Sequence, residues 1–348
     1  MFWKKKPTNI WQELKTKKPN GFFVLAPMAD VTDQAFRTII NQLGRPDLFY
    51  TEFGAVDGMS TPQAHRRIKT QIFRFEKKQK PIIAQIFGGK PENYFKVAQE
   101  IANMGFDGLD LNTGCPQKNI VKQVCGAALT QKEHWPTVAE IIKNAKAGIA
   151  ASKNPIPFAV KTRLGFNHID LDWIKFLLKQ DLDALTIHLR TKKEMSKVPA
   201  HWELAQEITD LKNEIAPNTV LLFNGDIKSI AQGRAKLKEC GADGIMIGRG
   251  IFENPTLFAE EIFAEKSIKE KTDILLEHTR LFEKEFGDTF WNRHYFGGRT
   301  RAFATLKRFY KIYINGFEGA KDFREVLMNC HNQDEVKHAV KNFLNQHQ

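Results

Sequence analysis

Residues 157–190 read PFAVKTRLGFNHIDLDWIKFLLKQDLDALTIHLR, which contains two short apolar runs separated by a longer amphipathic segment. The outer runs, Pro157–Arg163 and Ala184–Arg190, each end in a basic residue. In the middle segment, Leu171–Lys179, apolar residues recur at the spacing of one helix face. Because alternating strands and helices favour a parallel sheet, this stretch predicts a strand, a crossover helix and a second parallel strand.

The same alternation extends over the first 250 residues. Eight apolar runs are expected to be strands: Phe22–Ala29, Asp47–Phe53, Pro81–Phe87, Gly108–Gly114, Pro157–Arg163, Ala184–Arg190, Val220–Asp226 and Gly244–Gly250. Helical spacing lies between them at Gln34–Leu43, Glu92–Met104, Trp135–Ala147, Leu171–Lys179, Trp202–Ile215 and Ser229–Glu239. Eight such units over roughly 250 residues predict an α/β fold of the (β/α)8 type, the TIM barrel, whose catalytic residues lie at the carboxyl ends of the strands.

The sequence pattern changes after Asn254-Pro255. No further strand pattern follows, and helical spacing runs from about Ser267 to the end of the sequence. We therefore expect a basic N-terminal extension over residues 1–20, a catalytic barrel over 21–262 and a smaller all-helical domain over 263–348.

One helical segment of the C-terminal part combines an apolar stripe with basic residues. The stripe keeps a spacing of three or four residues and is expected to be buried: Phe303, Leu306, Tyr310, Tyr313 and Phe317. The basic residues fall on more exposed arcs: Arg301, Lys307, Arg308 and Lys311. Such a face either contacts an anionic partner or is simply solvated.

The chain carries a formal net charge of +12, and this charge is clustered. The first twenty residues hold six Lys and one Glu, and the stretch from Thr61 to Lys80 holds seven Lys or Arg and one acidic residue, Glu76. Only basic charges occur between Asp288 and Glu318. Clustered positive charge favours a polyanionic partner such as nucleic acid, although a solvated basic surface has the same composition.

The four cysteines argue against a zinc site or a disulfide framework, because they include no C-x-x-C pair and no His at ligand spacing. A reducing cytoplasm fits this usage best. The same spacing gives no reason to expect a metal. No apolar run approaches the ~18 residues that would span a bilayer, so no membrane anchor is expected. Three of the cysteines are assigned to packing: Cys125, Cys240 and Cys330.

The most specific motif is LDLNTGCP at residues 109–116, a strand that delivers Asn112 and Cys115 to the barrel mouth. As a nucleophile, Cys115 would need a neighbouring His to lower its pKa. As a general acid it should stay protonated, which the usual thiol pKa of ~8.5 allows near neutral pH. A buried structural thiol is the third interpretation.

Two loops after the last predicted strands have the composition of a phosphate site. Asn224-Gly225-Asp226 and Gly248-Arg249-Gly250 offer small residues, backbone N–H groups and the Arg249 cation where barrels commonly bind phosphate. Each tripeptide alone is also an ordinary turn or loop. No G-x-G-x-x-G motif opens a helix after a strand, so a nicotinamide donor would have to visit the barrel mouth.

Lys161 and Arg163 alternate on one strand and would place two cations over the pocket. Burying two positive charges calls for an anionic or electron-rich ligand, and a reduced flavin is one. Gln85 and His188, at the tips of two other strands, are placed to hydrogen-bond the ring edge, or else are satisfied core residues.

In their order and spacing, these motifs resemble the tRNA-dihydrouridine synthase family. The matching segments are Ala26-Pro27-Met28-Ala29, Val31-Thr32-Asp33, AQIFG around Gln85, NTGCP at 112–116, Lys161-Thr162-Arg163, His188, Arg190-Thr191, NGD at 224–226, GRG at 248–250 and Asn254-Pro255. The likeness covers the barrel and enters the helical tail. Departures from the family pattern are Asp30, Cys125 and Phe309.

The resemblance implies an enzyme with an FMN-bound barrel, which acts on tRNA and takes electrons from NADPH or NADH. We further expect the chain to be monomeric and, from its cysteine usage, cytoplasmic. Residues implied to surround the flavin are Pro27, Met28, Ala29, Gln85, Lys161 and His188, with Asn224, Gly225, Asp226, Gly248 and Arg249 at its chain and phosphate. Asn112, Arg163 and Arg190 would bind the substrate, and Cys115 matches the proton donor.

The implied reaction is reduction of the C5=C6 bond of a tRNA uridine that has left its stack. Hydride from the flavin adds at C6, and Cys115 protonates C5. Two alternatives stay open: a flavin enzyme of a free pyrimidine, like the dihydroorotate dehydrogenases, and a tRNA-binding protein without catalysis. The first would not need a basic helical tail, and the second could lose Cys115 and Lys161.

Overall fold

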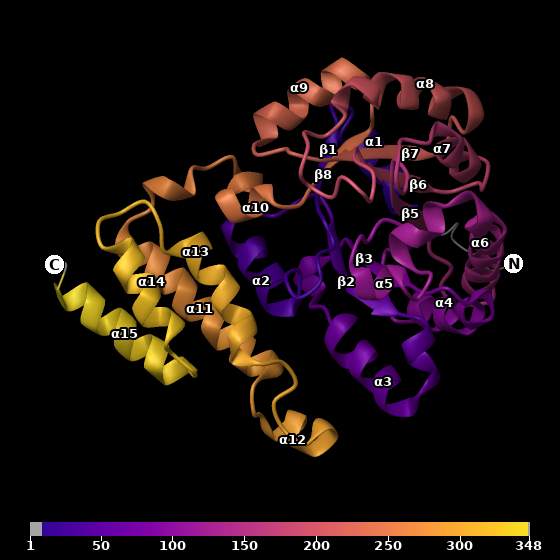
Figure 1. The fold of residues 1–348 in the computed structure, drawn as a ribbon. Helices are drawn as coiled ribbons and strands as arrows, with labels where there is room; N and C mark the ends of the chain where they lie inside the picture. The colour runs from indigo at the N-terminus through magenta and orange to yellow at the C-terminus, as the bar shows by residue number, and fades with distance from the viewer. Residues whose placement is uncertain (1–8, 347–348) are drawn as a thin grey trace, which may run out of the picture. The chain divides into compact units, whose positions relative to one another are not determined.

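The computed structural model describes residues 9–346, which form two compact units (Figure 1). The first unit comprises residues up to 29 and residues 46–248. The second comprises residues 30–45 and 249 onward. The chain therefore enters the second unit twice.

The first unit is built on one sheet of eight parallel strands. The strands are β1 (Phe22–Leu25), β2 (Phe49–Ala55), β3 (Ile82–Phe87), β4 (Gly108–Asn112), β5 (Phe158–Arg163), β6 (Ala184–His188), β7 (Val220–Asn224) and β8 (Gly244–Ile247). Their order is β1-β8-β7-β6-β5-β4-β3-β2, and a parallel bridge between Val24 and Leu48 joins the two ends. All eight predicted strands are confirmed, and the TIM barrel with them.

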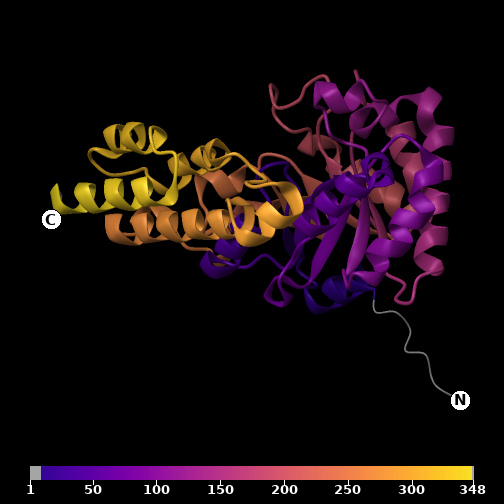
Figure 2. The ribbon, with the colours of Figure 1, turned by 90° about the horizontal axis from the view of Figure 1, so that it is seen from below.

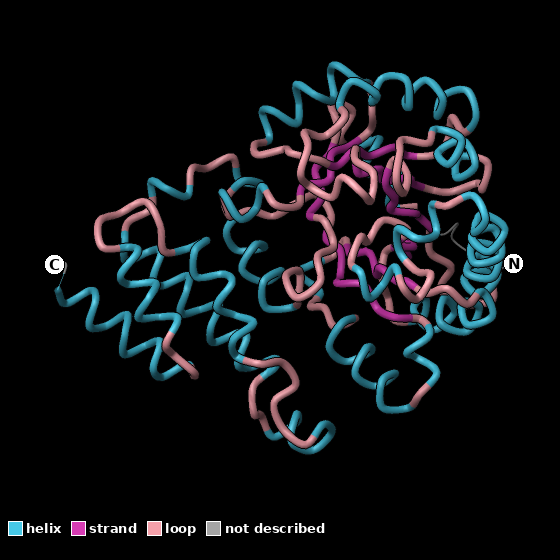
Figure 3. Tube along the Cα trace, in the orientation of Figure 1, coloured by secondary structure: helices cyan, strands magenta, loops and turns pink. Residues whose placement is uncertain are grey.

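Helices surround this sheet, as the cyan tube around the magenta strands shows in Figure 3. In the first unit they are α1 (Ile10–Lys17), α3 (Pro62–Arg67), α4 (Tyr94–Asn103), α5 (Lys118–Val121), α6 (Trp135–Ala150), α7 (Leu171–Leu178), α8 (Ala205–Ile215) and α9 (Ile230–Cys240). Local sequence begins several of them. The Asp170 carboxylate accepts from the Asp172 N–H at the start of α7, and the Ser229 hydroxyl accepts from the Gln232 N–H at the start of α9.

The barrel interior is apolar below its carboxyl end. Alternate residues of the strands meet in one buried cluster that includes Val24, Tyr50, Ile83 and Met246. Because side chains alternate across a strand, the residues two positions further along also face inward and form the next layer. In that layer β3, β5 and β7 place the polar residues Gln85, Lys161 and Asn224, whereas Ala26 follows β1, so the candidate site lies above an apolar core.

Helix α1 closes the amino end of the barrel. Its Trp11 is fully buried in the interior cluster. Two lysines of this region pair with carboxylates that precede strands: Lys15 with Asp243 at 2.9 Å, and Lys18 with Asp47 at 3.1 Å. Part of the basic N-terminal region therefore serves the fold, whereas residues 1–8, with the other lysines at the start of that expected extension, lie outside the described residues.

The second unit contains helices and no strand in its described residues. Its helices are α2 (Gln34–Leu43), α10 (Gly250–Glu253), α11 (Ile268–Phe286), α12 (Phe290–Phe296), α13 (Tyr310–Tyr313), α14 (Ala320–Met328) and α15 (Gln333–Gln346). Figure 2 shows α11 and α15 running side by side. The ring of Phe36 on α2 lies 4.9 Å from that of Phe309 and 5.8 Å from that of His278.

The apolar stripe predicted around residue 310 is buried, although it is not one helix. A 3-10 helix over Phe303–Phe309 is followed by α13, and only Phe317 of the stripe is half-buried. The prediction for Arg301 was wrong: its side chain is 11% exposed and donates to the buried Asp33 carboxylate at 3.0 Å. Arg308 and Lys311 are exposed, as predicted, and Lys307 is half-buried.

Candidate active site

Four neighbouring strands bring five of the predicted site residues to one rim of the barrel. Gln85 lies on β3, Asn112 ends β4, Lys161 and Arg163 lie on β5, and His188 ends β6. In the sheet register Asn112 is opposite Lys161, and Arg163 is opposite His188. The parallel arrangement therefore collects side chains that are far apart in the sequence.

Asn112 holds the loop that carries Cys115. Its Oδ1 accepts from the backbone N–H groups of Gly114 and Cys115 at 3.0 and 2.9 Å, and its Nδ2 donates to Gln85 Oε1 at 3.0 Å. Gly126 lies against the same loop with φ +56°, where an added Cβ would fall 2.8 Å from the Cys115 carbonyl oxygen. The position of the thiol is thus set by hydrogen bonds and by the absence of a side chain at Gly126.

The Cys115 side chain is buried, with 9% of the residue exposed. Burial raises its pKa above the ordinary thiol value, and this effect outweighs the hydrogen bond from the Gln117 backbone and the charges of Arg163 and Lys161. Cys115 is therefore a neutral thiol at physiological pH. That protonation state suits a proton donor and does not suit a nucleophile.

A buried carboxyl that the sequence analysis did not single out lies two residues before Asn112. Gln85 Nε2 donates to Asp110 Oδ2 at 2.7 Å. Burial raises the pKa of Asp110 to about 7, although the Gln85 hydrogen bond and the Lys161 charge oppose the shift. The spacing of Asp110 and Asn112 on one strand is the sequence signal that would have found it, because residues i and i+2 share a face.

Lys161 is the cation that acts most directly on this carboxyl. Its Nζ donates to Asn224 Oδ1 over a long contact of 3.4 Å. Burial lowers the pKa of Lys161 to about 8, and the neighbouring Arg163 charge lowers it further, against the attraction of Asp110. An ammonium group has three donors, so Lys161 retains capacity for an anionic or accepting ligand.

Arg163 connects two loops at the rim. Its Nε donates to the Gly114 carbonyl at 2.7 Å, next to Cys115 in the chain. Its NH1 donates to the carbonyls of Thr191 and Met195 at 3.1 and 3.2 Å, in the segment after β6. Arg163 therefore fixes the loop of the thiol against the loop that follows His188.

Arg190 and Asp226 form a second connection, between the segments that follow β6 and β7. A guanidinium nitrogen of Arg190 donates to the Asp226 carboxylate, which also accepts from the Ala200 N–H at 2.9 Å. Gly225 has φ +146°, and an added Cβ would lie 2.7 Å from Ala200 Cβ, so this position requires glycine. The backbone conformation of Asn224-Gly225-Asp226 is thus constrained by Gly225 and by the hydrogen bonds of Asp226.

The remaining predicted residues follow β7, β8 and β1, which are adjacent in the sheet. Asn224 Nδ2 donates to the Met246 carbonyl at 2.8 Å. An added Cβ on Gly248 would lie 3.7 Å from Ala26 Cβ and 3.9 Å from Met28 Sδ, which is ordinary van der Waals contact. The other positions differ in exposure: Pro27 is buried, Met28 is half-buried, and Ala29 and Arg249 are exposed.

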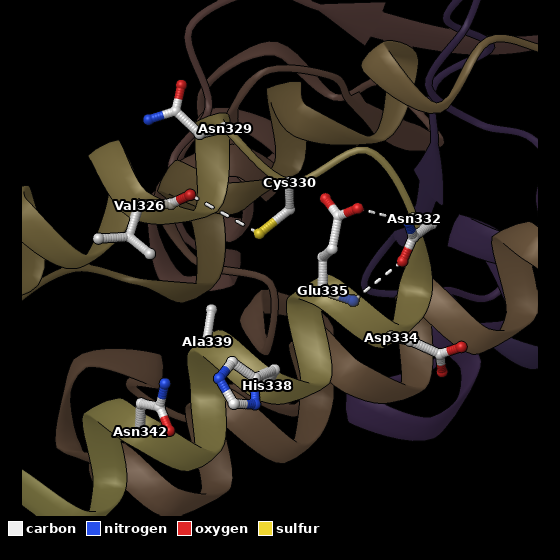
Figure 4. Close-up of a pocket in the computed structure, with 9 residues that line it drawn as sticks. All are labelled: Val326, Asn329, Cys330, Asn332, Asp334, Glu335, His338, Ala339 and Asn342. Carbon is white, nitrogen blue, oxygen red and sulfur yellow. Dashed lines mark hydrogen bonds between the residues drawn. The ribbon is translucent and has the colours of Figure 1, made fainter.

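A separate cavity of about 630 Å³ lies between α14 and α15 in the second unit (Figure 4). Its polar groups bond to one another: Asn332 Nδ2 donates to Glu335 Oε1 at 2.6 Å, and the Glu335 N–H donates to Asn332 Oδ1 at 2.9 Å. These bonds cap the first turn of α15. Across residues 9–346, no group of three or more His, Cys, Asp or Glu is arranged to hold a metal ion, and no helix is long and apolar enough to cross a membrane.

Comparison with known proteins finds relatives that match over almost the whole chain. The model of the dihydrouridine synthase family matches residues 24–348. The probable tRNA-dihydrouridine synthase of Staphylococcus aureus (strain MRSA252) is 42% identical over 337 residues, which cover 96% of this chain and 95% of the relative. The probable tRNA-dihydrouridine synthase 2 of Bacillus subtilis (strain 168) is 43% identical over 338 residues, 96% of each chain.

Among solved structures, 2-naphthoyl-CoA reductase superposes with a TM-score of 0.51 at 10% sequence identity, covering 68% of this chain and 49% of that chain. At this identity the likeness concerns the fold alone. It agrees with the barrel described above.

Proposed function

The chain belongs to the dihydrouridine synthase family, and on that premise we propose that Cys115 is the proton donor with which it reduces uridine in tRNA. The enzyme is a flavin-dependent oxidoreductase that reduces the C5=C6 bond of tRNA uridine. The observation that carries the proposal is a buried, neutral thiol held by Asn112 at the carboxyl end of β4.

The residues at the rim fit a flavin. When bound, the reduced flavin supplies the hydride that adds to C6 of the uracil ring. The support from this chain is the Lys161 ammonium, whose burial lowers its pKa to about 8 and whose hydrogen bond to Asn224 is long, at 3.4 Å. An electron-rich ligand would stabilise the charged form of such a lysine.

We assign two groups of residues to the flavin, in the form of FMN. Those proposed for the ring and its ribityl chain are Pro27, Met28, Ala29, Gln85, Lys161 and His188. Those proposed for the rest of the chain and the phosphate are Asn224, Gly225, Asp226, Gly248 and Arg249. Among the residues proposed for the chain and phosphate, the exposed Arg249 would supply a positive charge, whereas Asp226 also has the structural role of bonding Arg190.

For the uracil base we propose Asn112, Arg163 and Arg190, which also hold the loops at the rim. Cys115 protonates C5 while these loops keep the thiol in place and limit the access of water. General acid catalysis of this kind contributes roughly 10²–10⁴-fold to a rate. Rigid placement of the donor contributes by orientation.

Further proposals concern the surroundings of the reaction. We propose NADPH or NADH as the source of electrons, a monomeric chain and a cytoplasmic setting. We also propose that residues 21–262 are the catalytic domain and 263–348 the tRNA-binding domain, with residues 30–45 packed as part of the second unit.

The test of the donor is Cys115→Ala, with Cys125→Ala as the matched control. Both thiols are buried and belong to one small cluster with Ile120, and neither is in a disulfide. With Cys115→Ala we expect NADPH still to bleach the flavin absorbance, while dihydrouridine formation falls about 10²-fold or more. Cys125→Ala should retain product formation.

The substrate is tRNA from a strain that lacks dihydrouridine, and the product is measured by mass spectrometry of nucleosides. Undiminished product from Cys115→Ala would reject the role of the thiol. Equal losses in both variants would indicate a packing defect of the cluster and would also reject it. Turnover of free uracil in place of tRNA would reject the substrate.

A further inference from the structure

Helix α12, with the sequence FWNRHYF, presents aromatic rings to solvent. Phe290 is 87% exposed and Trp291 is 49% exposed. Of the seven residues of this helix only Asn292 is buried. Figure 1 shows α12 beyond the end of α11, apart from α13, α14 and α15. Large exposed aromatic side chains in adjacent positions are unfavourable in water and usually mark a contact surface.

Hydrogen bonds, and not buried apolar side chains, fix the position of this helix. The Thr289 hydroxyl accepts from the Asn292 N–H at 3.1 Å at the start of the helix. Asn292 Nδ2 donates to the carbonyls of Glu285 and Gly287 at 3.1 and 2.8 Å, at the end of α11. Gly297, in the left-handed region with φ +76°, ends it. The helix therefore keeps its orientation while its rings remain outside.

The rings occur in two pairs along the helix surface. The rings of Phe290 and His294 are nearly parallel, with 11° between their planes and 6.3 Å between their centroids. The rings of Trp291 and Tyr295 are 4.1 Å apart at 47°. The spacing of four residues puts each pair on one side of the helix, and the rings of His294 and Tyr295, 4.5 Å apart at 87°, join the two pairs into one cluster. The exposed rings of Phe290 and Trp291 are the ones that a planar partner can reach.

The charges that follow Asp288 in this region have one sign. Between Asp288 and Glu318 every charged residue is basic. Arg293 on α12 is 67% exposed and pairs with Asp288, itself 53% exposed, at 2.8 Å. An exposed pair of this kind contributes little to stability, so Arg293 can exchange its partner for a phosphate at small cost. Aromatic rings next to exposed cations are the composition with which proteins bind unpaired nucleotides.

We propose that α12 is a stacking platform for unpaired bases of the tRNA, with Arg293 beside it for the backbone phosphate. This inference rests on the proposed function, which makes tRNA the substrate. A protein partner or a second copy of the chain would use the same rings but has no need of the excess of basic residues in this segment, which remains although Arg293 pairs with Asp288 and Arg299 with Glu283. The charge pattern therefore favours RNA.

The experiment measures the affinity of the full-length holoenzyme for tRNA after Phe290→Ala and Trp291→Ala are combined. Stacking on an aromatic side chain contributes roughly 1–3 kcal/mol per base, so we expect the dissociation constant and the KM for tRNA to rise about 10- to 100-fold. The kcat at saturating tRNA and the rate of flavin reduction by NADPH should not change. The conservative pair Phe290→Tyr and Trp291→Phe should retain most of the affinity.

The matched control is Val326→Ala with Met328→Ala. These α14 residues are 53% and 51% exposed apolar side chains of the same unit, and their replacement should leave tRNA affinity within about twofold of wild type. Two RNA probes are compared with tRNA: a single-stranded oligonucleotide, whose binding should weaken in the alanine pair at α12, and a perfect duplex, whose binding should change little.

Affinity for tRNA unchanged by the alanine pair would overturn the proposal, and so would equal weakening for single strand and duplex. A change confined to oligomeric state would assign the rings to a second copy and overturn it as well. Failure of the proposed function gives a different result, because wild-type enzyme would then form no dihydrouridine while tRNA binding could still depend on α12.

Discussion

Three groups at the barrel rim lie where charge is disfavoured: the Asp110 carboxyl, the Lys161 ammonium and the Cys115 thiol. Burial shifts the pKa of each group in the direction that favours its neutral form. The pKa of Asp110 is raised to about 7, that of Lys161 is lowered to about 8, and that of Cys115 is raised above the ordinary thiol value. The thiol consequently holds its proton, and the other two groups titrate close to neutral pH. A flavin ring and a uracil ring, both with carbonyl acceptors, suit such surroundings.

Substitution of Asp110 by Asn should show this effect as a pH-dependent gain in stability. In the folded protein the pKa of Asp110 is raised from 3.8 to about 7. The contribution of this carboxyl to the free energy of unfolding is therefore fully present below pH 3.8 and is lost as the pH rises through 7. The asparagine side chain does not titrate, and its oxygen can still accept from Gln85. The free energy of unfolding of Asp110→Asn should therefore exceed that of wild type by about 2–4 kcal/mol above pH 7 and by little at pH 4.

Urea unfolding at several pH values measures this difference. The titratable groups that interact electrostatically with Asp110 are Lys161 and Tyr50, and both remain in the variant. Asp172→Asn, at a carboxylate 71% exposed on α7, is the control of the same chemical kind. A difference between Asp110→Asn and wild type that is constant from pH 4 to 8 would contradict the argument.

The sequence predicted the residues of the rim better than their contacts. Cys115, Asn112 and Lys161 could be placed because each lies at or just beyond the end of an apolar run, and parallel strands end at one rim. The connection from Arg190 to Asp226 could not be predicted, because it depends on the path of residues 191–200 between them. The assignment of individual roles at the rim stays a prediction.

At the scale of elements, strands were easier to predict than the helix at the amino end. The apolar composition of a buried strand is visible in its own residues, so all eight strands were found from local sequence. Helix α1 looks like a basic segment, and its role depends on Asp47 and Asp243, which are far away in the chain. Charge composition alone could not distinguish lysines that bind RNA from lysines that close a barrel.

Replacement of Trp11 by Ala should destabilise the first unit. Trp11 is fully buried in the interior cluster, and loss of a buried aromatic side chain costs about 3–5 kcal/mol. Its indole N–H has no hydrogen-bond partner within the described residues, so Trp11→Phe should cost less.

The measurement is the midpoint of urea unfolding, followed by far-ultraviolet circular dichroism. Thr16→Ala on the exposed face of α1 serves as the control and should stay within about 0.5 kcal/mol of wild type. Similar midpoints for Trp11→Ala and Thr16→Ala would show that burial of the Trp11 side chain does not stabilise the barrel.

At the scale of the molecule, the two units are interleaved in the chain. Residues 30–45 leave the first unit, supply α2 to the second, and return. Phe36 of α2 packs against His278 and Phe309, and Asp33 accepts from Arg301. The helical part beginning at residue 263 is therefore incomplete without a segment more than 200 residues earlier.

A fragment of residues 263–348 alone should not fold cooperatively. It leaves Phe309 and His278 without the Phe36 ring and leaves the Arg301 cation without its carboxylate. A fusion in which residues 30–45 are joined to 249–348 by a flexible linker should melt cooperatively, as measured by circular dichroism and calorimetry. A cooperative transition of equal midpoint in the fragment without residues 30–45 would refute this dependence.

The closure of the barrel by α1 has a consequence for the order of events during synthesis. Helix α1 is translated before every strand, yet the segment from Asn9 to Lys18 contacts Asp47, Asp183 and Asp243, and the last of these directly precedes β8. While the ribosome is still making the residues before Asp243, that acceptor is absent, and Trp11 lacks part of its final environment. Helix α1 therefore cannot make its full set of contacts until Asp243 has been synthesised.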